Sequence, residues 1–133
     1  MTADRDSAPR QALILFAHGS RDPEWATPFH RIRDIVAARR PDLLVEQAYL
    51  EFMTPTLADA LDRAAQAGAT RIAIAPLFMA QGGHLKHDLP RLVEALRARH
   101  AGARIRLLPP IGETESVLAA IGDWLIEALS KTY

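Results

Sequence analysis

The chain has 133 residues, of which 49% are hydrophobic, and this is enough to build the buried core of one domain. Lysine plus arginine equals aspartate plus glutamate at 16 each, so no overall field attracts nucleic acid or a membrane surface. There is no cysteine, which excludes disulfides, thiolate nucleophiles and cysteine-ligated metals. A metal site in this chain must therefore use histidine and carboxylate side chains.

The first ten residues lack the apolar stretch of a secretion signal. We expect a flexible tail at residues 1–10 and a single domain at residues 11–133. No apolar run approaches the roughly 20 residues that a membrane-spanning helix requires. The sequence therefore predicts a cytoplasmic protein that has neither a membrane nor a nucleic acid as its partner.

The first predicted strand and helix lie near the N-terminus. Residues 13–17 form a continuous apolar run, which is typical of a strand covered on both faces. Asp22 followed by Pro23 predicts a helix start, because the aspartate can cap the backbone and proline fits the first turn. Apolar residues then recur at helical spacing as far as Val36, and Pro41 predicts the end of this helix.

The same alternation continues in the middle of the chain. Residues 43–50 predict a second strand, and Thr54 followed by Pro55 predicts the start of a helix that runs to about Gly68. Residues 71–78 predict a third strand. Because Pro76 has no amide proton, it predicts either a bulge or the end of that strand.

The last part of the chain repeats the pattern once more. Asp88 predicts the cap of a third helix with an apolar stripe at residues 89–96. Residues 104–108 predict a fourth strand, and Thr114 predicts the cap of a final apolar helix. Four strand–helix units in a row predict an α/β fold in three layers, with a four-stranded parallel sheet flanked by helices as in flavodoxin-like proteins.

Side chains that can ligate metals follow three of the predicted strands. His18 follows the first strand, Glu51 the second and His84 the third. Ligands of open parallel sheets bind beyond the carboxyl ends of the strands, so we expect these three side chains at one edge. Gly19 removes side-chain bulk beside His18, and the glycines at 82–83 allow a ligand to approach the backbone. Two imidazoles and a carboxylate suit divalent cobalt, iron, nickel or zinc.

Each of these residues also has a purely structural interpretation. His18 could be a half-buried histidine bonded to a carbonyl, and Glu51 could be a solvated carboxylate. His84 could lie in an ordinary flexible loop. We interpret His87 as a neighbour that supports the site, and Asp88 as a helix cap that is also placed to orient an imidazole.

The motifs resemble those of the small CbiX-type chelatases, relatives of the sirohydrochlorin ferrochelatases. The resemblance rests on His18 to Arg21, on Pro76 to His84 and on Asp88 to Pro90, and it covers about residues 11–130. Tyr49 to Glu51 also resembles the middle motif of the family. The resemblance implies a chelatase half-domain, a lyase that inserts a divalent metal into sirohydrochlorin in cobalamin or siroheme-type biosynthesis.

The resemblance also implies roles for individual residues. His18 and His84 are the candidate catalytic residues, and together with Glu51 they are the candidate metal site. An imidazole can accept the pyrrole N–H protons that the metal displaces, and which histidine does so stays open. Arg21 and Lys86 are candidates to bind the carboxylates of the substrate. The metal is a substrate, with cobalt as the first expectation and iron or nickel as alternatives, and no organic cofactor is expected.

Two other functions are alternatives to a chelatase. Nucleotide binding suits the fold, but the turn after the first strand lacks the glycine pattern that presents backbone amides to phosphates. A noncatalytic metal or tetrapyrrole carrier needs similar ligands, so the sequence leaves it open.

We expect a homodimer, because a domain of this length offers one binding edge to a broad, flat macrocycle, whereas larger chelatases join two half-domains in one chain. Four apolar residues near the strand ends are candidates to line the cleft between the copies, although Phe78 also suits the ordinary core. These residues are Phe52, Met53, Phe78 and Met79.

Overall fold

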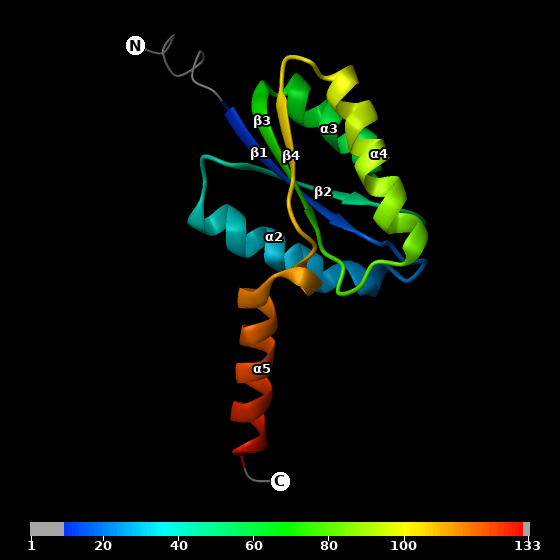
Figure 1. Ribbon diagram of the computed structural model, residues 1–133. Helices are drawn as coiled ribbons and strands as arrows, with labels where there is room; N and C mark the ends of the chain where they lie inside the picture. The colour runs from blue at the N-terminus through cyan, green and yellow to red at the C-terminus, as the bar shows by residue number, and fades with distance from the viewer. Residues whose placement is uncertain (1–9, 132–133) are drawn as a thin grey trace.

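A computed structural model describes residues 10–131, and its four strands form one parallel sheet (Figure 1). The strands lie in the order β2-β1-β3-β4. With right-handed crossovers, this order places the helix before β2 on one face of the sheet and the next two helices on the other. The strands are β1 (Arg10–Ala17), β2 (Leu44–Tyr49), β3 (Ala69–Pro76) and β4 (Arg104–Leu107).

The helices alternate with the strands, as the sequence predicts. The short helix η1 leads into α2, which packs on β2 and β1, and α3 and α4 lie together on the opposite face (Figure 1). This arrangement confirms the predicted α/β fold with a parallel sheet flanked by helices. The helices are η1 (Pro23–Ala26), α2 (Thr27–Arg39), α3 (Leu57–Gln66), α4 (Gly83–Arg99), η2 (Ile111–Glu113) and α5 (Glu115–Leu129).

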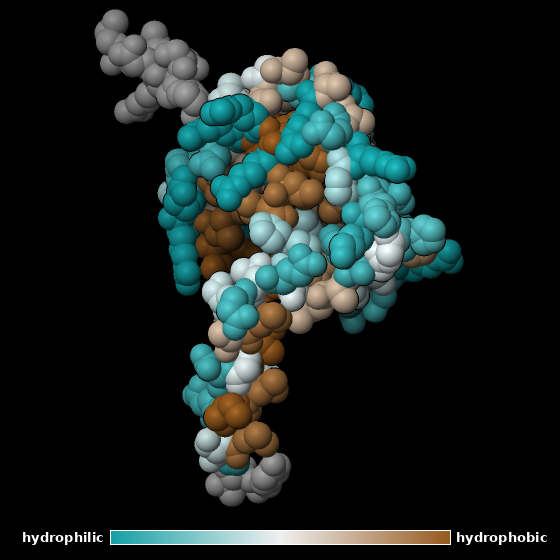
Figure 2. Space-filling model, viewed as in Figure 1, coloured by the Kyte–Doolittle hydropathy of each residue, from teal (hydrophilic) through white to brown (hydrophobic). Residues whose placement is uncertain are grey.

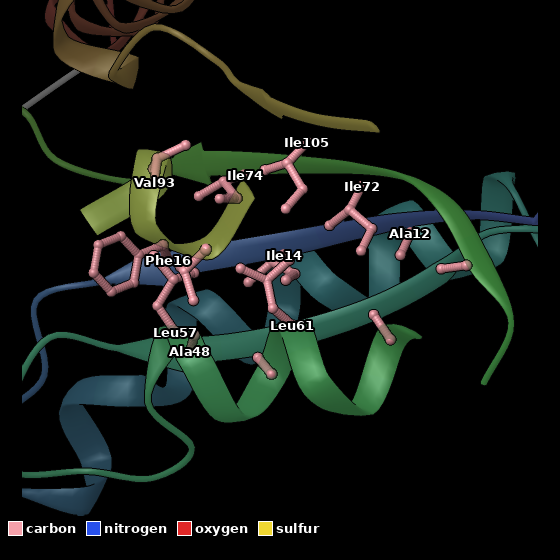
Figure 3. Packing of buried hydrophobic residues seen from close by; sticks show 14 of the residues in the cluster. Ala12, Ile14, Phe16, Ala48, Leu57, Leu61, Ile72, Ile74, Val93 and Ile105 are labelled. Atoms are coloured by element: carbon pink, nitrogen blue, oxygen red, sulfur yellow. The ribbon is translucent and has the colours of Figure 1, made fainter. Parts of the chain in front are cut away.

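The main core lies between the sheet and the helices α3 and α4 (Figure 3). Side chains of a strand alternate between the two faces, so every second residue of β1 and β3 points into this layer. There they pack against Leu57 and Leu61 of α3 and Val93 of α4. The buried strand residues are Ala12, Ile14, Phe16, Ile72 and Ile74.

Two predicted helix starts are wrong. Thr56, rather than Thr54, caps α3, and its hydroxyl accepts a hydrogen bond from the Asp59 amide at 3.2 Å. The chain turns into the helix only there, because the Pro55 carbonyl still accepts a hydrogen bond from the Tyr49 amide at the end of β2. The capping residue of α4 is Gly82, not Asp88.

Helix α4 begins six residues before the start that its local sequence favours. Leu85 packs against the buried core, so tertiary contact stabilises a first turn that begins at Gly83. His84, Lys86 and Asp88 are therefore helical residues. Pro76 is the last residue of β3, so of the two alternatives predicted for it, a bulge or the end of the strand, the second is confirmed.

The final helix carries the predicted apolar residues but does not cover the sheet. Helix α5 projects from the body of the molecule, and its main contact is with η2 (Figure 1). None of its residues is buried. Thr114 occupies the position before its first turn, but its hydroxyl donates to the Pro110 carbonyl at 3.0 Å instead of capping the helix.

The ends of the chain limit two predictions. Of the predicted tail at residues 1–10, only Arg10 is described, as the first residue of β1, and the rest lies outside the described residues. Among residues 10–131, no helix combines the length and the apolar character needed to cross a bilayer. The single domain at 11–133 and the cytoplasmic location stay predictions.

Candidate functional site

The candidate site lies at the edge of the sheet where its parallel strands end. We call the loops after β1, β2, β3 and β4 the rim (residues 18–22, 50–56, 77–82 and 108–110). Hydrogen bonding between β1 and β2 continues into the rim: the Leu50 amide donates to the Ala17 carbonyl at 2.9 Å, and the Glu51 amide donates to the His18 carbonyl at 3.0 Å. This backbone pairing holds His18 and Glu51 side by side.

The side chains of these two residues contact each other directly. His18 Nε2 and Glu51 Oε1 are 2.9 Å apart, and the side chains remain 53% and 47% exposed. The structure therefore does not support the purely structural interpretations of these residues. His18 contacts the Glu51 carboxylate rather than a carbonyl, and Glu51 has a partner in addition to solvent. An exposed pair contributes little to stability, and both side chains are accessible to a ligand at the rim.

The separation of the two atoms also suits a metal. Metal–nitrogen and metal–oxygen bonds of about 2.1 Å to two atoms 2.9 Å apart enclose an angle of about 90°. That angle corresponds to neighbouring positions of an octahedral ion. Two protein ligands at such positions leave the others open, as transfer of the metal to another molecule requires.

The His18 ring stands against a buried aromatic residue. Its centroid is 6.3 Å from that of Phe78, and the two rings meet edge to face at 82°. Phe78 is only 5% exposed and packs against Phe16, which confirms that it belongs to the core. The sequence did not indicate that Phe78 orients the imidazole, because the contact joins residues 60 positions apart.

Gly19 is required by the backbone of the neighbouring loop. A Cβ atom there would lie 1.8 Å from the Glu51 carbonyl oxygen, and its φ of +96° is a conformation that other residues rarely adopt. From the sequence, Gly19 is expected to remove side-chain bulk beside the His18 imidazole. The structure instead assigns it to the close approach of the two loops that carry His18 and Glu51.

Arg21 is held at the rim by an aromatic contact. Its guanidinium carbon lies 4.7 Å from the ring centroid of Phe52, which is an attractive cation–π geometry. Phe52 follows Glu51, has a φ of +65° and is 57% exposed. Ser20 Oγ accepts a hydrogen bond from the Asp22 amide at 3.1 Å, which stabilises the turn after β1.

The residues predicted after β3 lie apart from the His18–Glu51 pair. His84, Lys86 and His87 are exposed in the first turns of α4. Lys86 lines a hollow of about 290 Å³ between this helix and the loop after β4. Among residues 10–131, no three His, Asp or Glu side chains lie close enough together to hold one metal ion, so the role of His84 stays a prediction.

The fold and the His18–Glu51 pair define a parallel α/β protein with a candidate ligand site at the carboxyl edge of its sheet. A family model described as CbiX matches residues 12–128. The chain belongs to the CbiX family, which confirms the resemblance seen in its motifs.

Known proteins similar to the chain agree with this family. A "Sirohydrochlorin cobaltochelatase" of Saccharolobus islandicus is 33% identical over 127 residues, which cover 91% of this chain and 94% of that protein. The crystal structure of a putative cobalamin biosynthesis CbiX protein from Marinobacter aquaeolei has a TM-score of 0.77 and 34% identity, covering 92% of this chain and 99% of the other. The sirohydrochlorin chelatase SirB from Bacillus subtilis subspecies spizizenii, in complex with cobalt, has a TM-score of 0.73 and 28% identity, covering 89% of this chain and 50% of SirB.

Proposed function

We propose that this protein is a sirohydrochlorin chelatase that inserts a divalent metal, with cobalt as its principal metal substrate. The observation that carries the proposal is the His18–Glu51 pair, half exposed and 2.9 Å apart at the rim. The names of the relatives, a sirohydrochlorin cobaltochelatase and a chelatase in complex with cobalt, support both the substrate and the metal.

The pair has the chemistry that metal insertion needs. When a divalent metal enters a tetrapyrrole, two pyrrole N–H protons leave and four nitrogens replace the previous ligands of the metal. An imidazole that is not bound to the metal accepts protons near neutral pH, so the protons go either to His84 or to His18 once the metal has left it, and the Glu51 carboxylate stabilises the His18 cation. Nitrogen and oxygen donors hold divalent cobalt less tightly than a thiolate set, so the metal can be surrendered.

His84 is proposed as the second imidazole of the reaction. Hydrogen bonding between β1 and β3 extends to the rim, where the Leu77 amide donates to the Phe16 carbonyl at 2.8 Å. The loop that begins at Leu77 leads directly to His84 in the first turn of α4. A macrocycle bound across the rim would face His18 from one loop and His84 from the next.

Turnover is the test of this function. Sirohydrochlorin is mixed with Co²⁺ and a tenfold smaller amount of protein, and the change in its absorbance is followed with and without protein. A chelatase converts many equivalents of tetrapyrrole at a rate above the protein-free reaction. Binding of at most one equivalent, with no acceleration, would identify a noncatalytic carrier instead. Parallel reactions with Fe²⁺ and Ni²⁺ test the choice of metal, and we expect Co²⁺ to react fastest.

Arg21 and Lys86 are proposed to bind the carboxylates of the substrate. Arginine can hold a carboxylate through two hydrogen bonds, whereas lysine supplies a point charge. We therefore expect Arg21→Ala to raise KM for sirohydrochlorin about tenfold at low salt, and Lys86→Ala to raise it less. Arg31→Ala, on the exposed side of α2, is the matched control. Unchanged kinetics in both rim variants would remove these residues from the site.

The working unit is proposed to be a homodimer. One rim can cover only one face of a flat macrocycle. The match to this chain covers only 50% of SirB, so the SirB chain is about twice as long and has room for a second half-domain. Phe52 and Met79 at the rim are 57% and 56% exposed, and they are available to line a cleft between two copies together with the half-buried Met53. Light scattering during size-exclusion chromatography at micromolar concentration tests the dimer, and a monomer that stays fully active on dilution would contradict it.

A further inference from the structure

Phe52 lies in the middle of the loop after β2 and has a backbone conformation that aromatic residues rarely adopt. Its φ is +65°, and no other non-glycine residue among residues 10–131 has a positive φ. In this left-handed region the Cβ atom of an ordinary residue crowds a neighbouring carbonyl oxygen, so Phe52 is strained. Glycine has no Cβ atom and would occupy the same position without the strain.

The Phe52 side chain gains little stability in return for this strain. It is 57% exposed, so much of the ring lies outside the core. The Arg21 guanidinium, 4.7 Å from the ring centroid, makes a cation–π contact at an exposed site, and such a contact contributes no more than the left-handed conformation costs. Folding alone therefore does not explain an aromatic residue here, and strained residues of this kind concentrate at binding sites.

Backbone hydrogen bonds hold both ends of the loop that carries Phe52. At its start the Glu51 amide donates to the His18 carbonyl at 3.0 Å, and where the loop returns the Tyr49 amide donates to the Pro55 carbonyl at 2.9 Å. Phe52 therefore stays beside the candidate metal site, because it directly follows Glu51. A ligand that contacts the Phe52 ring is close to the His18–Glu51 pair.

The rim has exposed apolar side chains in addition to those that Figure 2 shows on the side carrying β4 and α2 and along the projecting α5. Leu50, Phe52 and Met79 are 39%, 57% and 56% exposed. They come from the loops after β2 and β3, and since β1 lies between these strands, they flank the loop that carries His18. Apolar side chains around a few polar groups suit a tetrapyrrole, whose flat apolar face surrounds its nitrogens.

Arg21 adds a positive charge at the Phe52 ring. Its guanidinium lies over the ring, and its side chain is exposed. Within the described part of the chain, residues 10–131, Arg21 forms no ion pair with an acid. Arginine binds a carboxylate through two parallel hydrogen bonds. A flat ligand with flexible carboxylate arms can therefore contact the ring with its face and the guanidinium with one arm.

We propose that the face of the tetrapyrrole stacks on the Phe52 ring, and that Arg21, held against the same ring, binds one of its carboxylate arms. Aromatic rings attract each other in offset stacks, and such a stack fixes the plane of the macrocycle beside the His18–Glu51 pair. Because its loop is hydrogen-bonded at both ends, the ring is in place before the ligand binds. The inference rests on the proposed chelatase and names Phe52 as a residue that binds its substrate.

Binding of metal-free porphyrins tests the stack without any turnover. The probes are uroporphyrin, which is rich in carboxylates, and coproporphyrin, which has half as many, and the anisotropy of their fluorescence gives Kd for the metal-free protein. We expect Phe52→Gly to raise Kd for both probes about tenfold. Phe52→Tyr keeps the aromatic face and is the matched control, with a Kd within about twofold of the native value. An unchanged Kd for Phe52→Gly, or no binding of either probe to the native protein, would overturn the proposal.

Thermal melting separates a binding role of the ring from a structural one. Glycine and asparagine both tolerate a positive φ, so Phe52→Gly and Phe52→Asn remove the ring without adding strain. We expect Kd to rise about tenfold in both variants while Tm falls by no more than about 3 °C. A larger fall in Tm, or a native Kd in either variant, would show that the ring serves the fold rather than the ligand.

A double variant separates the stack from the contact with Arg21. In an Arg21→Ala background, Phe52→Gly should still raise Kd for coproporphyrin by at least about threefold. No further effect would mean that Phe52 acts only by holding Arg21, and the stack would be overturned. The outcome is independent of metal insertion: a native protein that binds porphyrin through Phe52 but never turns over sirohydrochlorin would contradict the chelatase and uphold the stack.

Discussion

Replacing His18 with alanine is expected to lower kcat for cobalt insertion by roughly 10²–10⁴-fold, the range for loss of a group that transfers protons. The substitution removes the only imidazole that contacts Glu51 in the described part of the chain. The ring is 53% exposed, so its removal leaves no buried cavity, and thermal stability should stay nearly unchanged. Steady-state kinetics and a melting curve on the same preparation measure both effects.

Companion variants at the rim separate the partners of His18. Glu51→Gln keeps the shape of the side chain and removes its charge. We expect a smaller loss of kcat, about tenfold, because a carboxylate beside an imidazole orients the ring and adjusts its basicity. His84→Ala should also weaken cobalt binding and slow insertion if it is the second imidazole. Native rates in both the His18 and the His84 variant would contradict the proposed site.

The strands could be predicted closely because their signal is local. Ile14 and Phe16 are buried beneath α3 and α4, while Leu15 is buried on the opposite face, and only a strand covered on both sides requires such a continuous apolar run. The parallel direction of the strands then follows from the regular alternation of strands and helices, whereas the order β2-β1-β3-β4 does not follow from the sequence. The position of His18 and Glu51 at one edge follows in turn, since both stand directly after parallel strands.

Features that depend on distant contacts could not be predicted. The first turn of α4 is stabilised by the packing of Leu85 on the core, although Asp88 is the stronger local signal for a helix start. The contact of Arg21 with Phe52 depends on a positive φ at an aromatic residue, which no sequence pattern indicates. The apolar stripe of α5 predicts a helix packed on the sheet, but it does not indicate that the helix projects from the sheet.

The loops of the rim are coupled by their backbones, and this coupling makes Gly19 the most sensitive position near the site. Gly19→Ala is expected to destabilise the protein by about 2 to 5 kcal/mol, the sum of a left-handed conformation for alanine and an overpacked contact. For a chain of this length, that corresponds to a decrease in Tm of roughly 10 °C or more.

The alanine should also cost activity, since its Cβ atom would overlap the Glu51 carbonyl oxygen, 1.8 Å away, and the loops that carry His18 and Glu51 must separate to admit it. We expect kcat to fall at least tenfold at a temperature where the variant is still folded, because the imidazole and the carboxylate then no longer meet. Gly102→Ala, in the turn before β4 at the opposite end of the sheet, is the matched control, since a Cβ atom there meets nothing within 4 Å and its φ is outside the left-handed region. A Gly19 variant with native stability and native kcat would show that the two loops can separate freely, and that the backbone contact does not set the geometry of the pair.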